Sequence, residues 1–184
     1  MEIGATKVVQ DRLKTTKIEE SKGASLVFCW DTHLTKIKGR NVLFIVNASN
    51  RYTIAMTDIE PRNWNYYTMY IRSVIHGVMQ EMGYSEDQIG QYFKMSGDTT
   101  VTKTHGRKSV GGINRMVMDA QYFGKKLEKE AKYQWELSEY LNRDICQPEG
   151  FDAYGYPSEL FKLDMERLGI ISKRKPAKII DFTK

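Results

Sequence analysis

The chain has 184 residues, 41% of them hydrophobic, a length and composition that suit one folded domain and need no cross-links for stability. Two cysteines and three scattered histidines exclude a disulfide framework and show no metal-ligand spacing, so we expect no metal site and no cofactor. The formal charge is +5, and the lack of a signal peptide or of an apolar run near the roughly 20 residues that span a bilayer predicts a cytoplasmic protein without a membrane partner.

The first third of the chain predicts a strand, a helix and then an antiparallel meander. Residues 1–14 have the pattern of a short strand followed by a helix that Thr6 caps. Apolar runs separated by turn residues predict the next strands, at 25–30, 34–37, 42–46 and 51–56. Val42–Val46 lacks polar alternation, so we expect it in the centre of the sheet, covered on both faces.

The rest of the chain is predicted to be mainly helical. A helix is expected over 58–82, and Ser85 with Gln88 forms a capping box for a second helix that ends near residue 94. The β-branched run Thr99–Thr104 predicts a strand, followed by a turn at 105–108. Further helices are expected over 109–142, beginning at a Ser109 cap and becoming charged, and over 158–168.

This order of elements predicts an α+β fold. We expect a small, mostly antiparallel sheet of about four to six strands, packed with helices. The expected organisation is an α+β core over 1–127, a charged helical extension over 128–171 packed on or beside the core, and a basic, mobile tail over 172–184.

The segment Thr102–Arg115 is the best candidate for a functional surface. A strand leads into a basic turn and a helix start, where free backbone N–H groups and the helix dipole favour an oxyanion such as phosphate. Gly111-Gly112 lowers helix stability there, which indicates a close approach to the backbone. The Gly-x-x-x-x-Gly-Lys-Ser/Thr order of a P-loop is absent. The alternative is a capped helix with solvated charges. Predicted ligand contacts in the segment are Lys103, Thr104, Arg107, Lys108, Ser109, Asn114 and Arg115.

Two stretches without acidic residues, 32–57 and 99–118, hold eight of the 28 basic residues and would form a positive face if they met in space. Three further residues are secondary candidates. Arg51 could contact phosphate or cover the sheet edge, Trp30 could stack on a base or lie in the core, and Asn47 could contact a ligand or only shape its turn.

His105 is the candidate acid/base residue, because an imidazole in this turn could titrate near neutral pH. No carboxylate within the segment is available to orient it.

Three stretches of the sequence carry a resemblance: Trp30 with His33-Leu34, Val42–Val46 with the following Asn47–Tyr52, and Thr102–Asn114 with its Thr-Lys-Thr-x-x-Arg-x-Ser-Val-Gly pattern. They resemble a bacterial, plasmid and phage family known only as a domain of unknown function. The resemblance spans Met1 to Leu127. It implies a mobile-element (phage or plasmid) context and no mechanism.

The leading hypothesis is a binding module for nucleic acid or a phosphate-bearing ligand that uses residues 102–115. One alternative is a phosphodiester- or nucleotide-processing enzyme of a defence, counter-defence or toxin system, with His105 as acid/base and Lys103 and Arg107 stabilising developing charge. Another is a protein-interaction subunit that uses the helix over 125–143, for example to form a homodimer.

Overall fold

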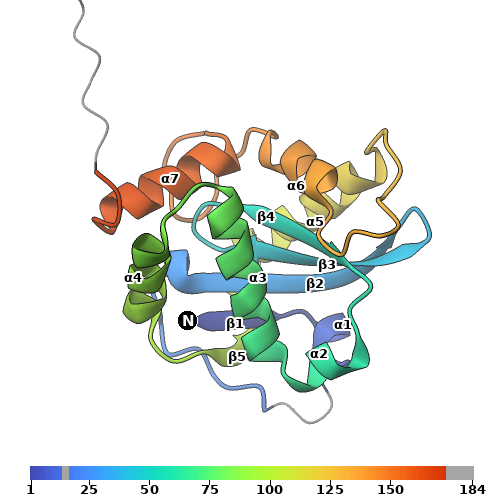
Figure 1. Cartoon of the computed structure of the whole chain (residues 1–184), viewed down its shortest axis with the longest axis horizontal. Coiled ribbons are helices and arrows are strands. Elements are labelled where there is room, and N and C mark those ends of the chain that lie inside the picture. Colours follow the sequence, from blue (N-terminus) through green and yellow to red (C-terminus); the bar gives the residue numbers. More distant parts are fainter. Residues whose placement is uncertain (14–16, 173–184) are drawn as a thin grey trace, which may run out of the picture.

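A computed structural model of the chain describes residues 1–13 and 17–172 (Figure 1). The strands are β1 (Glu2–Ala5), β2 (Cys29–Ile37), β3 (Arg40–Asn47), β4 (Thr53–Thr57) and β5 (Thr100–Lys103). The helices are α1 (Lys7–Gln10), α2 (Pro61–Asn65), α3 (Tyr67–Glu81), α4 (Glu86–Ser96), α5 (Gly106–Gln121), α6 (Trp135–Asn142) and α7 (Pro157–Arg167). The predicted α+β fold is confirmed. Of the basic tail predicted over 172–184, only residue 172 lies within the described residues.

The strands form one mixed sheet in the order β4-β3-β2-β1-β5. The predicted antiparallel meander is confirmed, because β2–β3 and β3–β4 are antiparallel ladders of eight and five residue pairs. β1 pairs in parallel with both β2 and β5, over four residue pairs each. The N-terminal strand therefore lies inside the sheet. β5 pairs with β1, about a hundred residues earlier in the chain, and its Thr102 also forms an isolated parallel bridge with Glu19.

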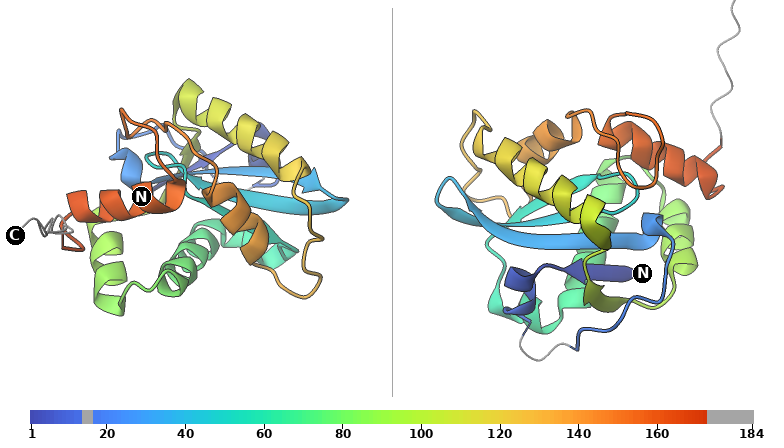
Figure 2. Two further views of the ribbon diagram at one scale, coloured as in Figure 1. Left: turned by 90° about the horizontal axis from the view of Figure 1, so that it is seen from above. Right: turned by 180° about the vertical axis from the view of Figure 1, so that it is seen from behind.

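Helices cover both faces of the sheet, which explains why residues Val42–Val46 of β3 are all apolar. Leu43 and Ile45 face a core formed with α3, α4 and α7, whereas Val42 and Phe44 face a second core formed with α5 and α6. The prediction that Val42–Val46 is central and covered on both faces is confirmed. Figure 2 shows α5 lying across the face of the sheet opposite to α3.

Several predicted boundaries were wrong. The strand predicted over 25–30 is a 3₁₀ turn, Leu26–Phe28, followed by β2, which continues through to Ile37 without a break. The helix predicted over 58–82 is divided into α2 and α3 at Tyr66, whose φ of −114° and ψ of 41° are not helical. The Ser85–Gln88 capping box of α4 is confirmed, with both of its hydrogen bonds present.

The prediction of one long helix over 109–142 was also wrong. α5 begins three residues earlier, at Gly106, and ends at Gln121, and α6 is a separate helix. The residues between them follow the edge of β4, where Thr57 N donates to Lys132 O (2.8 Å) and Gln134 N donates to Ala55 O (2.9 Å). Pairing with the exposed edge of the sheet replaces helix continuation and covers an edge that would otherwise be open.

Residues 135–171 take part in both cores of the protein. Leu137 and Leu141 of α6 pack in the core on the α5 face of the sheet, and Phe161 and Met165 of α7 pack in the core on the α3 face. Within residues 1–13 and 17–172, no helix is long and apolar enough to cross a membrane.

Candidate functional site at the start of helix α5

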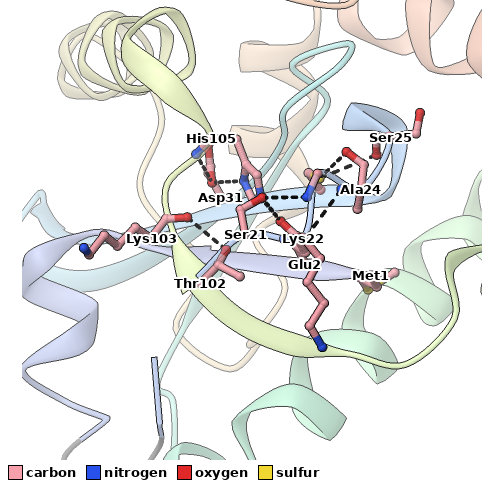
Figure 3. Close-up of polar contacts among 12 residues, drawn as sticks. Met1, Glu2, Ser21, Lys22, Ala24, Ser25, Asp31, Thr102, Lys103 and His105 are labelled. Atoms are coloured by element: carbon pink, nitrogen blue, oxygen red, sulfur yellow. Dashed lines mark hydrogen bonds and ion pairs between the residues drawn. The ribbon is translucent and has the colours of Figure 1, made fainter. Parts of the chain in front are cut away.

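His105, the residue that precedes α5, is held between two carboxylates (Figure 3). Its Nδ1 lies 2.7 Å from Asp31 Oδ1, and its Nε2 lies 3.1 Å from Glu2 Oε2. We call Glu2, Asp31 and His105 the carboxylate–histidine cluster. Glu2 is 103 residues and Asp31 is 74 residues away from His105 in sequence. The segment around His105 therefore contains neither of the carboxylates that orient it.

The register of the parallel strands brings the cluster together. Glu2 pairs with Cys29, and Gly4 pairs with Asp31. Side chains two residues apart point to the same face of a strand, so Glu2, Cys29 and Asp31 all project toward α5, while Ile3 and Trp30 project into the opposite core. The β5–α5 junction then places the imidazole over this face.

The cluster is almost completely buried. Glu2 is 3% exposed, Asp31 is not exposed, and the His105 side chain is 6% exposed. Burial alone lowers the pKa of His105, but hydrogen bonds to Asp31 and Cys29 and the charge of Asp31 outweigh it and raise this pKa to about 10. His105 is therefore an imidazolium at neutral pH.

Glu2 is held as a carboxylate by its hydrogen bonds. Burial alone raises the pKa of Glu2, but the Ser21 hydroxyl, the Lys22 N–H and His105 together lower it below its ordinary value. Across the described ranges, no lysine or arginine side chain forms an ion pair with Glu2 or Asp31. The charge of His105 is the one that offsets the two acids.

Asp31 also fixes the start of α5. Its carboxylate accepts hydrogen bonds from His105 N (3.2 Å) and from the Ser109 hydroxyl. Ser109, predicted as the helix cap, lies inside the first turn and binds this carboxylate instead of a backbone N–H. An internal anion thus already lies at the positive end of the helix.

Gly4 makes this arrangement sterically possible. A Cβ atom on Gly4 would lie 1.8 Å from Asp31 Oδ1 and 3.0 Å from His105 Nδ1. Any side chain at this position would overlap the Asp31 carboxylate. The glycine inside a strand and the single acid in each of two strands are the sequence signals that could have pointed to the cluster.

The predicted basic ligand contacts lie at the surface, on the end of β5 and along α5. Lys103 lies 3.6 Å from Glu20, and Arg115 lies 3.2 Å from Asp119, in exposed ion pairs. Lys108 Nζ donates to Pro148 O at 3.2 Å. Arg107 and Asn114 are exposed, and Thr104 is half-buried.

The two acid-free stretches of sequence meet along α5. Arg51 lies against Gly112, where a Cβ atom would be 3.6 Å from Arg51 Cδ. Just beyond the second stretch, at the end of α5, Gln121 Nε2 donates to Lys36 O at 3.0 Å. Gly112 therefore accommodates Arg51, whereas the space around Gly111 is open.

Trp30 and Asn47, the other two predicted ligand residues, are built into the fold. Trp30 is 1% exposed, and its Nε1 donates to the Tyr92 hydroxyl at 2.9 Å. Asn47 is 1% exposed and shapes the turn after β3, since its Oδ1 accepts from Ser49 N at 3.0 Å. These positions match the alternative interpretations, core for Trp30 and turn geometry for Asn47.

The part of the chain predicted to serve protein interaction forms one side of a groove. This groove, of about 520 Å³, lies between the end of α5 and α6. Aromatic side chains from both sides line it, among them Phe123, Trp135 and Tyr140.

Fold and site together define an α+β protein in which a buried carboxylate–histidine cluster anchors a helix with a basic exposed surface. The chain belongs to the family described as domain of unknown function DUF6933, which it matches over residues 2–160. The match continues well beyond Leu127, where the predicted resemblance ended, and includes α6. No curated protein and no solved structure matches the chain.

Proposed function

We propose that the protein binds nucleic acid through the exposed basic residues around α5. The observation that carries this proposal is that the two acid-free stretches meet at α5, where Arg51 lies beside Gly112. Positive charge from distant parts of the sequence gathers along one helix, as in proteins that bind polyanions.

The position of the basic residues favours an extended polyanion over a small phosphate ligand. Arg107 and Arg115 lie on a helix surface about 12 Å apart along its axis, given the rise of about 1.5 Å per residue. The Asp31 carboxylate already occupies the start of α5. Contacts from long side chains to successive phosphates therefore suit this surface better than a nest of backbone N–H groups does.

In this proposal His105 is a positioning residue. Both of its ring nitrogens face buried carboxylates, and its pKa is raised to about 10. It has no free nitrogen with which to take a proton from a substrate, so the geometry gives the enzymatic alternative little support. The cluster instead fixes the start of α5, the helix that carries Arg107.

Fluorescence anisotropy with labelled duplex DNA, single-stranded DNA and RNA over a series of salt concentrations tests the proposal. We expect affinity for duplex DNA to fall steeply with salt, with log K decreasing by about 0.9 per neutralised phosphate for each unit of log salt. The double variant Lys103→Ala/Arg107→Ala should bind more weakly and reduce this slope by about 1 to 2.

The matched control is Arg62→Ala/Lys94→Ala, which removes the same two residue types from α2 and α4 on the α3 side of the sheet. It should bind like the wild type. Binding that is absent, that is insensitive to salt, or that falls equally in both double variants would refute the proposal.

A second candidate is self-association through the groove between α5 and α6. Two large side chains that line the groove are exposed, Trp135 at 39% and Tyr140 at 42%. Two more near the end of α5 are exposed as well, Met118 at 60% and Tyr122 at 80%. Exposed apolar groups in one area are typical of interaction surfaces. Light scattering after size exclusion should then show a dimer that Tyr122→Ser with Tyr140→Ser converts to a monomer, and a wild-type monomer at all concentrations would exclude it.

A further inference from the structure

Three side chains with metal-ligating atoms meet beneath the start of α5. They are Glu2, Cys29 and His105, and one ligand atom from each lies within 4.8 Å of the others. Their positions in the chain, one near the N-terminus, one at the start of β2 and one after β5, have no ligand spacing that a sequence motif would reveal. Nucleic-acid binding at the surface makes no use of the Cys29 thiol.

We propose that Glu2, Cys29 and His105 bind a zinc ion, with Asp31 orienting the imidazole. A carboxylate oxygen, a thiolate and an imidazole nitrogen are the three ligand types that zinc accepts, whereas magnesium and calcium prefer oxygen alone. Three protein ligands leave the fourth tetrahedral position to a solvent molecule.

The distances in the cluster are close to those that zinc needs. Zinc–ligand bonds of about 2.0–2.3 Å place two tetrahedral ligand atoms roughly 3.3–3.8 Å apart. Glu2 Oε2 and His105 Nε2 are 3.1 Å apart, and one ligand atom from each of Glu2, Cys29 and His105 lies within 4.8 Å of the others. Side-chain rotation can close this difference without any movement of the strands.

Asp31 supplies the feature that most distinguishes this cluster from a chance gathering of polar groups. Its Oδ1 lies 2.7 Å from His105 Nδ1, the ring nitrogen that does not face the other two ligands. Ligating histidines in proteins usually donate this second N–H to a carboxylate, which fixes the tautomer and the ring orientation. The parallel register and Gly4 hold Asp31 in that position.

The charges balance when a divalent cation enters. The imidazolium loses its Nε2 proton, and the Cys29 thiol, which now donates to the carbonyls of Ala24 and Ser25, loses its Sγ proton. Two protons leave and one Zn²⁺ enters, so the net charge of the buried cluster stays the same.

The test uses the full chain, purified in the presence of a chelator and then transferred to metal-free buffer. Zn²⁺ is titrated in competition with a chromophoric chelator, and Co²⁺ is added separately to report the ligand types by absorption. We expect one equivalent of each metal to bind and the Co²⁺ complex to show a thiolate-to-metal charge-transfer band in the near ultraviolet.

Variants then identify the ligands. Cys29→Ser should abolish the charge-transfer band, and Asp31→Asn should weaken Zn²⁺ binding by about 10- to 100-fold while leaving the band in place. Two matched controls, Cys146→Ser at the other buried cysteine and His76→Gln at an exposed histidine, should bind both metals like the wild type.

Several outcomes would overturn the proposal: no stoichiometric binding, a Co²⁺ spectrum without thiolate character, or loss of binding in a control rather than in Cys29→Ser. Circular dichroism shows whether each variant folds. If Cys29→Ser does not fold, the wild-type Co²⁺ spectrum together with the Cys146→Ser control still identifies the sulfur ligand.

Discussion

Replacing Gly4 by alanine tests the geometry of the buried cluster with the smallest possible change. The added Cβ atom would lie 1.8 Å from Asp31 Oδ1, far inside the contact distance of two such atoms. Asp31 has little freedom to move away, because its carboxylate is bound by His105 N, His105 Nδ1 and the Ser109 hydroxyl. Either the carboxylate breaks these bonds or β1 shifts relative to β2.

Both responses are expensive in free energy. Overpacking a well-filled interior costs about 1–3 kcal/mol, and the loss of a hydrogen bond to a charged group costs about 1.5–3 kcal/mol. We therefore expect Gly4→Ala to lower the free energy of unfolding by about 3–5 kcal/mol, a large part of the roughly 5–15 kcal/mol typical of a domain.

Urea denaturation at neutral pH, followed by circular dichroism, measures this change. The matched controls are Gly77→Ala in α3 and Gly90→Ala in α4, where nothing lies within 4 Å of an added Cβ. Alanine is the better helix former, so each control should raise the free energy of unfolding by about 0.5–1 kcal/mol. Replacing glycine by alanine is thus expected to lower the free energy of unfolding at Gly4 and to raise it at Gly77 and Gly90.

A double-mutant cycle with Asp31→Ala assigns the effect to the proposed contact. With the carboxylate gone, Gly4→Ala should cost less than about 1 kcal/mol, which corresponds to a coupling of at least about 2 kcal/mol. If stability is too low, the cycle can be measured in the Gly77→Ala/Gly90→Ala background. A loss below about 1 kcal/mol in the wild type, or an equal loss with and without Asp31, would show that the reasoning is wrong.

Three further predictions concern single groups. Ser109→Ala removes a donor to the buried Asp31 and should cost about 1.5–3 kcal/mol in urea unfolding, whereas Ser73→Ala, at an exposed hydroxyl, should change stability by less than about 0.5 kcal/mol. Burial raises the pKa of Asp164, and a raised pKa stabilises the fold only at low pH. The stability of Asp164→Asn relative to the wild type should therefore increase as the pH rises above about 4. A difference in urea midpoint that stays constant with pH would contradict this. Gly111→Ala should stabilise α5 by about 0.5–1 kcal/mol and leave DNA affinity unchanged, because the proposed contacts come from side chains; weaker binding in the anisotropy assay would point to backbone contact.

Local patterns in the sequence were enough to predict most of the elements. The apolar run Val42–Val46 correctly predicted a central strand, and Ser85 with Gln88 correctly predicted the start of α4. These features depend on residues that are neighbours in the chain. The end of α5 was missed because the charged pattern of 125–142 resembles a helix, while the decisive factor was the free edge of β4, a long-range feature.

The candidate site was only half predictable, for the same reason. His105 and the basic residues were found because they share one segment. Glu2, Cys29 and Asp31 were missed because they become neighbours of His105 only through the parallel register of β1 with β2 and β5. Short strands of four residues carry too little pattern to specify such pairing from one sequence.

The order of the strands has a consequence for how the protein folds. The meander of β2, β3 and β4 needs only short loops, whereas β5 must find β1 across about a hundred residues, which is the slowest kind of contact to form. The cluster around His105 cannot exist until that last pairing is made, and an opening of the four-residue edge strand β5 would dissolve it while the rest of the sheet stayed intact. We therefore expect β5 to join the sheet last, with the buried charges at this junction holding it in place once it has paired.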